Sequence, residues 1–269
     1  MEAGSGPLAL CLHGFPDSAH TWRGLIPELA AAGFRTVAPF TRGYAPSSVP
    51  EGGGYDPGTL AADANALHEV LGGDSDAVII GHDWGSTVTY GAAASEPHRW
   101  SKVVGMAVPP GEVFLVALIT NIAQIKRSWY MFFFQHPLAD VVVPSGDLAL
   151  IDDLWATWSP GFDGGEDLVR AKACLADRAN LQAALGYYRD TLSPQALAEL
   201  QGAPVPLPSQ PLLYIHGRND GAVGVDVTEA AAATAPETVH VTIIENAGHF
   251  LNLEQPKVVH QLILEHVAC

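Results

Sequence analysis

The sequence predicts an α/β protein built on a mostly parallel sheet of about six strands. Short apolar runs alternate with segments whose apolar residues recur at helical spacing, a pattern typical of strand–helix–strand crossover units. Strands are expected at residues 8–12, 34–39, 77–80, 102–108, 212–216 and 239–244. Helices are expected at residues 20–32, 59–71, 84–95, 225–233 and 256–267.

The alternation is interrupted once, from residue 111 to residue 200. This stretch carries no strand pattern and is rich in aromatic residues within helical segments. The proline-rich segment 202–211 then leads back to the alternating pattern. We therefore expect a core domain formed by residues 1–110 and 201–269, with a helical lid inserted at residues 111–200.

The composition indicates a large apolar core and an acidic surface. The chain has 269 residues, 48% of them hydrophobic, and a formal net charge of −16. This charge argues against binding to nucleic acid or to an anionic membrane surface, and no apolar run reaches the length of a membrane span. Cys11, Cys174 and Cys269 are too scattered for a disulfide framework or a zinc site, so we expect two buried thiols and an exposed terminal one. No secretory leader is recognisable, and a cytoplasmic protein is expected.

The segment GHDWG at residues 81–85 follows one predicted strand and opens a predicted helix. Two glycines flank Asp83 at the spacing of a nucleophile elbow, a tight turn that exposes its middle side chain at the N-terminus of a helix. A carboxylate there suits displacement at a saturated carbon, because the resulting alkyl ester can later be hydrolysed by water. Taken alone, the same residue could simply cap the helix.

Two further polar residues follow the last two predicted strands. Asp220 comes just after strand 212–216, and His249 comes just after strand 239–244. Each alone would be an ordinary loop residue. Because ligand sites of parallel sheets lie beyond the carboxyl ends of the strands, we expect both residues beside Asp83. Their chain order is then nucleophile, acid and histidine.

Five segments together resemble the α/β-hydrolase fold and, within it, the epoxide hydrolases. They are HGFPDS at residues 13–18, RGYAPS at 42–47, GHDWGS at 81–86, the loop around Asp220, and NAGHF at 246–250. The resemblance covers essentially the whole chain. It implies an enzyme without cofactor or metal that converts a small apolar epoxide and water into a vicinal diol.

The resemblance also implies a role for each residue of the triad. Asp83 would be the nucleophile, and His249, oriented by Asp220, would activate the water that hydrolyses the ester. The backbone N–H groups of Phe15 and Trp84 would form the oxyanion hole.

In the same family, two tyrosines of the lid hydrogen-bond the epoxide oxygen. Tyr130 stands where the first is expected, and Tyr188 matches the second better than Tyr187 does. Ring opening produces an alkoxide, which is a poor leaving group until a phenol supplies its proton. The side chains expected to contact the substrate are those of Phe15, Trp84, Tyr130, Tyr188 and Phe250.

The elbow alone also fits a haloalkane dehalogenase, in which N–H donors hold the departing halide. Trp84 could provide one donor, and the lid residues Trp129, Trp155 and Trp158 could provide another, whereas Phe15 offers no side-chain donor. Fluoroacetate dehalogenases are similar too, but place Arg where Trp84 stands. A non-catalytic binding protein of the same fold is disfavoured because all three triad members are present. An esterase would need a serine at the elbow.

Two features depart from the family pattern. Only seven residues precede Leu8, so we expect the N-terminal hairpin of the family to be missing. The exposed sheet edge would then be open to pairing, including formation of a homodimer. Phe40 stands where the family commonly has a loop-structuring Asp, which predicts altered loop packing and a reshaped pocket.

Overall fold

The computed structural model describes residues 1–200 and 205–268, without the side chains of Glu199 and Leu200. The first part of the expected return linker and the terminal thiol of Cys269 lie outside the described residues.

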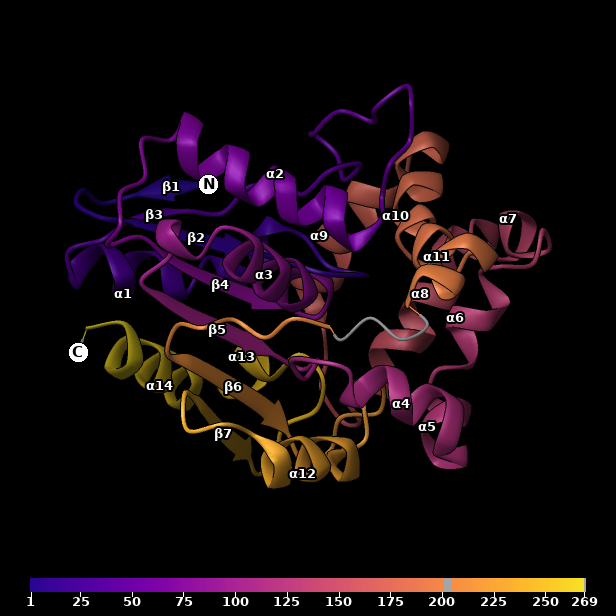
Figure 1. Cartoon of the computed structure of the whole chain (residues 1–269). Coiled ribbons are helices and arrows are strands. Elements are labelled where there is room, and N and C mark those ends of the chain that lie inside the picture. Colours follow the sequence, from indigo (N-terminus) through magenta and orange to yellow (C-terminus); the bar gives the residue numbers. More distant parts are fainter. Residues whose placement is uncertain (201–204, 269) are drawn as a thin grey trace.

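A seven-stranded sheet runs through the described part of the chain (Figure 1). Its strands are β1 (Glu2–Ala3), β2 (Leu8–Leu12), β3 (Arg35–Val37), β4 (Val78–His82), β5 (Lys102–Met106), β6 (Leu212–Gly217) and β7 (Val239–Ile244). Their spatial order is β1-β3-β2-β4-β5-β6-β7, and β2 to β7 pair in parallel. The order of the strands reverses at β2, which lies between β3 and β4, and ligand sites form at such reversals.

The predicted α/β class and mostly parallel sheet are confirmed, but the predicted count of six strands is wrong. Glu2 and Ala3 form β1, which pairs antiparallel with β3 and places Glu2 opposite Val37. The N-terminal amino group of Met1 also donates to the carbonyl oxygen of Ala38 at 2.7 Å. A two-residue strand is too short to show a periodic pattern, and its pairing uses backbone groups that every sequence has.

Six helices of the described chain pack on the sheet or follow its last strand. They are α1 (Leu25–Ala31), α2 (Pro57–Val70), α3 (Trp84–Ser95), α12 (Val225–Thr234), α13 (Leu251–Glu254) and α14 (Pro256–Ala268). Two 3₁₀ turns, η1 (Ala19–Trp22) and η2 (Pro97–Arg99), complete this part. The single helix predicted at residues 20–32 is therefore wrong. Gly24 separates η1 from α1, and Pro27 has no N–H to donate to the preceding turn.

Alternate residues of each strand point into two apolar layers. Leu10 and Ile79 belong to the layer that includes side chains of α2 and α3. Cys11 and Ile80 belong to the opposite layer, which includes side chains of α1 and α14. Cys11 and Cys174 are buried free thiols, as predicted.

Between β5 and β6 the described chain forms helices and no strand. These helices are α4 (Val113–Thr120), α5 (Ile122–Arg127), α6 (Trp129–Phe133), α7 (Ala139–Val142), α8 (Ser145–Trp158), α9 (Gly165–Leu175), α10 (Arg178–Thr191) and α11 (Pro194–Leu200). Most of them gather at the right-hand end of the sheet in Figure 1, the end toward which β6 points. They therefore lie beside the carboxyl ends of the parallel strands.

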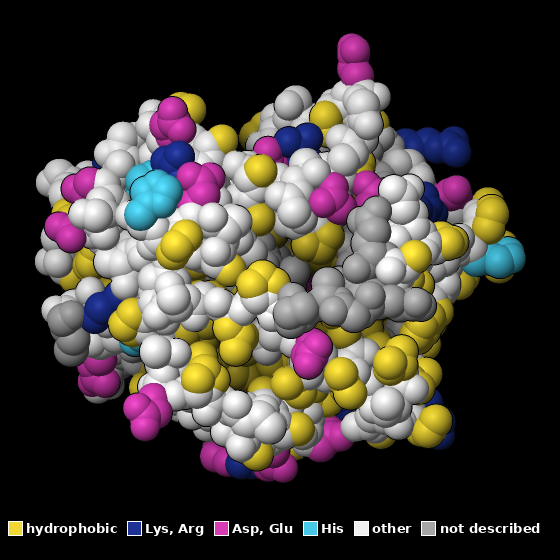
Figure 2. Space-filling view, viewed as in Figure 1, with side chains coloured by type: hydrophobic (Ala, Val, Ile, Leu, Met, Phe, Trp, Pro, Cys, Tyr) yellow, Lys and Arg dark blue, Asp and Glu magenta, His cyan; other side chains and the backbone are white. Residues whose placement is uncertain are grey.

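The surface is not uniform in character. Figure 2 shows apolar side chains gathered over α4 to α6, whereas acidic side chains are scattered over the whole face, one of them beside this apolar area. Within the described residues, no helix combines the length and the apolar character needed to cross a bilayer.

Candidate active site

Asp83 occupies the sharp turn between β4 and α3. Its backbone has a φ of 54° and a ψ of −119°, a conformation that non-glycine residues rarely adopt. The turn is possible because β4 and α3 approach closely: a Cβ at Gly81 would lie 2.2 Å from the carbonyl oxygen of Gly85. A Cβ at Gly85 would lie 2.0 Å from the carbonyl oxygen of Leu12. The glycines that frame Asp83 in the sequence are therefore sterically required for the elbow.

One oxygen of Asp83 is held by the loop that follows β2. The backbone N–H of Phe15 donates to Asp83 Oδ1 at 2.8 Å. A Cβ at Gly14 would lie 2.2 Å from this oxygen and 2.6 Å from the backbone nitrogen of Trp84. Oδ1 thus lies next to a donor from the β2 loop and to the N-terminus of α3, where negative charge is stabilised.

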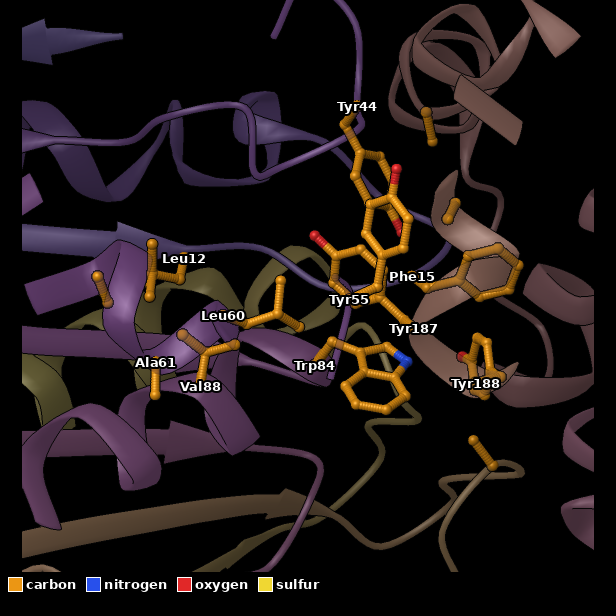
Figure 3. Close-up of a cluster of buried hydrophobic side chains, with 14 of the residues drawn as sticks. Leu12, Phe15, Tyr44, Tyr55, Leu60, Ala61, Trp84, Val88, Tyr187 and Tyr188 are labelled. Carbon is orange, nitrogen blue, oxygen red and sulfur yellow. The ribbon is translucent and has the colours of Figure 1, made fainter. Parts of the chain in front are cut away.

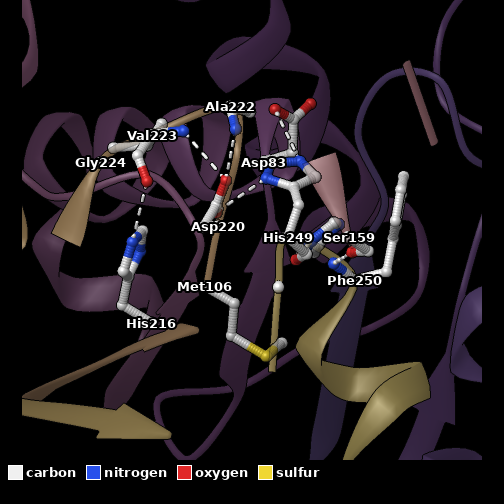
Figure 4. Close-up of polar contacts among 12 residues, drawn as sticks. Asp83, Met106, Ser159, His216, Asp220, Ala222, Val223, Gly224, His249 and Phe250 are labelled. Carbon is white, nitrogen blue, oxygen red and sulfur yellow. Dashed lines mark hydrogen bonds and ion pairs between the residues drawn. The ribbon is translucent and has the colours of Figure 1, made fainter. Parts of the chain in front are cut away.

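His249 lies between two carboxylates (Figure 4). Its Nδ1 is 2.9 Å from Asp220 Oδ2, and its Nε2 is 3.5 Å from Asp83 Oδ2. Burial alone would lower the pKa of His249, but the charges and hydrogen bonds of Asp220 and Asp83 outweigh burial and raise this pKa to about 10. An imidazolium therefore links the nucleophile to the carboxylate of Asp220.

The other oxygen of Asp220 is fixed by its own loop. Asp220 Oδ1 accepts from the backbone N–H groups of Ala222 and Val223 at 2.7 and 2.9 Å. Burial opposes the charge of Asp220, but the neighbouring His249 and these N–H donors stabilise it and leave the pKa of Asp220 below its usual value. The carboxylate can therefore orient the imidazole without taking its proton.

Tyr130 of α6 and Tyr188 of α10 lie together near the elbow. Their ring centroids are 5.7 Å apart, and both side chains are buried. Tyr188 also packs edge-on against Trp84 and Phe15, at centroid distances of 5.1 and 5.3 Å (Figure 3). Two helices far apart in the sequence thus bring two phenol rings together, and that of Tyr188 contacts both Phe15 and Trp84 beside Asp83.

The hydroxyl groups of these two tyrosines keep their protons. Burial raises the pKa of Tyr130 and of Tyr188 well above the usual value, and the negative charge of Asp83 raises both further. The buried Tyr188 hydroxyl has no hydrogen-bond partner among the described residues. Tyr187, in contrast, donates its hydroxyl to the carbonyl oxygen of Arg42 at 2.8 Å. Of the two adjacent tyrosines, Tyr188 is the one with a free donor.

A cavity of about 410 Å³ lies beside this cluster. Trp84 and Tyr187 line it together with Leu60, Val88 and Phe40, whereas the side chains of the triad do not. Figure 3 shows Trp84 and Tyr187 between the aliphatic side chains of the cavity and the rings near Asp83. Phe40, which departs from the family pattern, thus contributes an apolar wall where a carboxylate would be expected.

Phe250 directly follows the histidine but lies within a packed aromatic stack. Its ring stacks on Trp155 at a centroid distance of 3.8 Å and lies 5.8 Å from His82. Its side chain is fully buried. This packing supports the loop of His249 and gives no indication of contact with a substrate.

The three tryptophans of the insertion differ in their surroundings. Trp129 is 44% exposed. Trp155 donates its Nε1–H to the carbonyl oxygen of Pro16 at 2.8 Å. Trp158 packs against His249, with a centroid distance of 4.9 Å.

The C-terminal end of helix α8 contacts the loops that carry Asp220 and His249. No sequence motif predicts this contact. The carbonyl oxygen of Trp158 accepts from the backbone N–H groups of both Gly221 and His249, each at 3.0 Å. Ser159 Oγ accepts from the backbone N–H of Phe250 at 3.0 Å and donates to Glu254 at 2.7 Å. The insertion therefore positions the triad through backbone hydrogen bonds.

Two buried titratable residues lie next to the triad without having been assigned a role from the sequence. His82 Nε2 is 2.8 Å from the carbonyl oxygen of His249. Burial lowers the pKa of His82 to about 4, so its neutral ring donates through Nε2. Its Nδ1 lies 4.0 Å from Asp17, whose pKa burial raises to about 7. Both residues belong to segments that carry the family resemblance, which is the signal that could have drawn attention to them.

Within residues 1–200 and 205–268, no three or more His, Cys, Asp or Glu side chains are arranged to hold a metal ion.

Comparison with known proteins identifies relatives over nearly the whole chain. A family model described as alpha/beta hydrolase fold matches residues 7–256. The AB hydrolase superfamily protein YfhM of Bacillus subtilis is 31% identical, and the match covers 97% of this chain and 90% of the relative. Epoxide hydrolase A of Mycobacterium tuberculosis is 30% identical, over 98% of this chain and 92% of the relative.

Solved structures agree with these relatives. A mutant of an epoxide hydrolase from Bacillus megaterium has a TM-score of 0.84 at 26% identity, over 100% of this chain and 96% of that one. A second mutant of an epoxide hydrolase from the same organism, complexed with its naphthyloxy-propane-1,2-diol product, also has a TM-score of 0.84, at 25% identity and the same coverage.

Proposed function

The chain belongs to the α/β-hydrolase fold family, and we propose that it is an epoxide hydrolase that opens a small apolar epoxide to a vicinal diol. Relatives named epoxide hydrolase that are 30–31% identical over nearly the whole chain support this assignment. The observation that carries it is the pair of buried, protonated phenols of Tyr130 and Tyr188 beside the carboxylate of Asp83. A departing alkoxide requires such proton donors, whereas a departing halide does not.

In the first half of the proposed reaction, Asp83 Oδ2 attacks one epoxide carbon. An ester bond forms while the bond between that carbon and the epoxide oxygen breaks, and the oxygen takes a proton from Tyr130 or Tyr188. Asp83 Oδ1 stays bonded to the N–H of Phe15 and becomes the carbonyl oxygen of the ester.

Ester formation then prepares the second half. It removes the negative charge of Asp83, one of the two carboxylates that raise the pKa of His249. This pKa therefore falls in the intermediate, so the imidazolium passes its proton to the tyrosinate left by ring opening, and the neutral imidazole becomes able to accept a proton from water. His249 Nε2 is suited to this task because it lies 3.5 Å from Asp83 Oδ2, beside the carboxyl group that carries the ester.

The activated water attacks the carbonyl carbon of the Asp83 ester. Negative charge develops on Oδ1, where the backbone N–H groups of Phe15 and Trp84 would stabilise it. Collapse of this intermediate breaks the bond to the substrate, releases the diol and restores the carboxylate. Water supplies two protons: one restores the imidazolium of His249, and the other, on the carboxyl group formed by collapse, passes to the departing oxygen of the diol.

We also propose that residues 111–200 act as a lid on a core formed by residues 1–110 and 201–269. The lid would supply Tyr130 and Tyr188 and exclude water from the ester until the histidine activates one molecule. Phe15 and Trp84 would complete an aromatic wall around the substrate, which favours apolar epoxides. Phe250 is then a supporting residue behind His249.

The dehalogenase alternative has less support. Trp155 already donates its N–H to Pro16, and Trp129 is partly exposed, so neither is free to hold a halide at the nucleophile. Trp84 and Trp158 remain as candidate donors, and the experiment below includes a haloalkane for this reason.

The test is mass spectrometry of the variant His249→Gln after incubation with a small aryl epoxide or with a haloalkane. Without its base the enzyme should stall at the ester, so an adduct with the full mass of the epoxide is expected on the peptide that contains Asp83. The matched control, Asp83→Asn combined with His249→Gln, should form no adduct. An adduct from the haloalkane alone, lacking the halogen, would replace the proposal by a dehalogenase.

A further inference from the structure

A cavity of about 410 Å³ lies beside Trp84, and the reaction proposed above does not use it. Much of its wall comes from the loop that follows β3 and from helices α2 and α3. We call it the Phe40 pocket and define it by its apolar side chains Phe40, Leu60, Ala64, Leu67 and Val88. Its volume lies within the range of roughly 300–1,000 Å³ that is typical of pockets for small molecules.

The polar side chains around the Phe40 pocket are already engaged. Apart from the indole of Trp84, those that are buried or half-buried are His13, Thr41, Arg42, Ser47, Asp63 and Tyr187. Each has a hydrogen-bond or ion-pair partner among the described residues. His13 Nε2, for example, lies 3.1 Å from the hydroxyl oxygen of Thr41, and Arg42 Nε lies 2.5 Å from Asp63 Oδ2. Since an apolar group requires no hydrogen-bond partner, the pocket suits an apolar occupant.

Trp84 forms a wall that the Phe40 pocket shares with the candidate active site. Its indole lines the pocket, and its ring centroid lies 5.1 Å from that of Tyr188. Figure 3 shows Leu60 and Val88 on one side of the indole and Tyr188 on the other. Trp84 also directly follows the proposed nucleophile in the chain. A substituent that extends from the nucleophile along Trp84 would therefore reach the pocket.

An occupant of the Phe40 pocket needs an anchor outside it. Ligands are usually oriented by a few polar groups, and the groups around this pocket bind one another. The phenol of Tyr188 and the carboxylate of Asp83 belong to the neighbouring active site. A molecule with a polar end for that site and an apolar chain for the pocket matches both regions. An epoxide with an extended apolar substituent has this form.

The outer end of the Phe40 pocket is open to solvent. Val70 and Ser48 line the cavity and are exposed, and the exposed fraction of Val70 is 83%. A chain longer than the pocket could therefore continue into water without a clash. The pocket should thus favour long substituents over short ones and set no sharp upper limit on their length.

We propose that the Phe40 pocket holds the apolar substituent of the substrate while the epoxide ring lies at Asp83. The inference rests on the proposed function and narrows the substrate class to epoxides with an extended alkyl chain. Each methylene group that enters the pocket should raise kcat/KM about fourfold, which corresponds to about 0.8 kcal/mol. Phe40 is then a specificity-determining residue, because it supplies an apolar face to the wall.

The test is the kcat/KM of the unmodified chain for the terminal epoxides of butane, hexane and octane. We expect the value for the octane epoxide to exceed that for the butane epoxide by about 10²-fold, since four more methylene groups leave water. Ala64→Phe and Leu67→Trp, both on α2, each reduce the space in the pocket. Each should lower this ratio at least tenfold, chiefly by raising the KM for the octane epoxide.

The matched control is Ala62→Phe. It adds the same ring to α2 at an exposed position that does not line the Phe40 pocket. The ratio of the two kcat/KM values should remain that of the unmodified chain. Thermal unfolding of each variant reports whether it has folded.

A second measurement does not depend on these variants. In a crystal structure of the unmodified chain with the terminal diol of octane, the alkyl chain should lie against Leu60 and Val88. A chain that lies outside the Phe40 pocket would overturn the inference.

The kinetic outcomes separate this inference from the proposed function. Similar kcat/KM values for all three epoxides, or a ratio that both pocket variants leave unchanged, would overturn the inference and leave the proposed function standing. Absence of turnover for every epoxide, together with absence of the ester adduct in His249→Gln, would overturn the proposed function and the inference with it.

Discussion

The two sides of the candidate active site are built in different ways. On the core side, Asp83, Asp220 and His249 lie on short turns that directly follow strands, and backbone contacts fix those turns. On the side of the insertion, Tyr130 and Tyr188 come from two helices and are positioned by ring packing. The core side is thus specified by local backbone geometry, and the other side by the packing of aromatic side chains from two helices.

The largest effect is expected from Asp83→Asn, which removes the nucleophile but keeps its shape. Turnover of an epoxide should fall by about 10⁴-fold or more, as for other members of a catalytic triad. Asn keeps the shape of Asp, so the fold should be retained, but loss of one charge beside His249 should lower the melting temperature moderately at neutral pH. Steady-state kinetics and thermal unfolding measure both. Asp63→Asn, which breaks the surface ion pair with Arg42, is the control and should keep its activity.

The next largest effect is expected from the tyrosines. Tyr130→Phe and Tyr188→Phe should each lower kcat by about 10²-fold, because the departing alkoxide loses a proton donor. The double variant should lose more than either single one. Tyr187→Phe is the matched control: it removes the hydrogen bond to Arg42, should cost about 1 kcal/mol of stability, and should leave the chemistry unchanged. A double variant that turns over epoxides at the parent rate would show that the insertion supplies no acid.

The pH dependence of stability tests the charge arrangement of the core side. The pKa of His249 is raised from 6.5 to about 10 in the folded protein. A raised pKa contributes stability that is fully present below pH 6.5 and is lost as the pH rises through 10. The free energy of unfolding, measured with denaturant, should therefore fall between these values by roughly a few kcal/mol. His249→Gln should show a flatter profile over the same range, and an identical decline in both would contradict the charged pair.

The smallest effect is expected where the two sides meet. Ser159→Ala removes the acceptor of the Phe250 N–H and the donor to Glu254. Leaving the buried N–H of Phe250 unpaired should lower stability by about 1–3 kcal/mol, seen as a lower denaturant midpoint, whereas Glu254 keeps the Gly248 N–H as a partner. Thr157→Ala, two residues earlier on α8, removes a hydroxyl that bonds only within its own helix among the described contacts. It should change the midpoint far less.

The contrast between the two sides also explains what the sequence could predict. The positions of Asp83, Asp220 and His249 were predictable because each follows an apolar run that ends in a turn. The choice between Tyr187 and Tyr188 depended on family resemblance, since only the packed structure shows Tyr187 bonded to Arg42. A motif on one chain segment cannot reveal which of two adjacent side chains a distant loop will engage.

Other features were out of reach for different reasons. Strand β1 has two residues, too few for any periodicity. The contacts of the Trp158 carbonyl involve a backbone atom, which carries no sequence signature.

The two hydrogen bonds accepted by the carbonyl oxygen of Trp158 tie the end of α8 to two loops of the triad. One atom at the end of α8 holds both the loop of Asp220 and the loop of His249, and the backbone there is so close that a Cβ at Gly221 would lie 2.0 Å from the carbonyl oxygen of Thr157. A movement that lifted this end of α8 would break both hydrogen bonds of the Trp158 carbonyl and would thereby disturb the contact between His249 and Asp220. In the lid proposed above, the end of α8 would therefore be the fixed point, and opening for substrate would have to occur elsewhere in the insertion. Substrate entry and orientation of the triad would then depend on different parts of the same insertion.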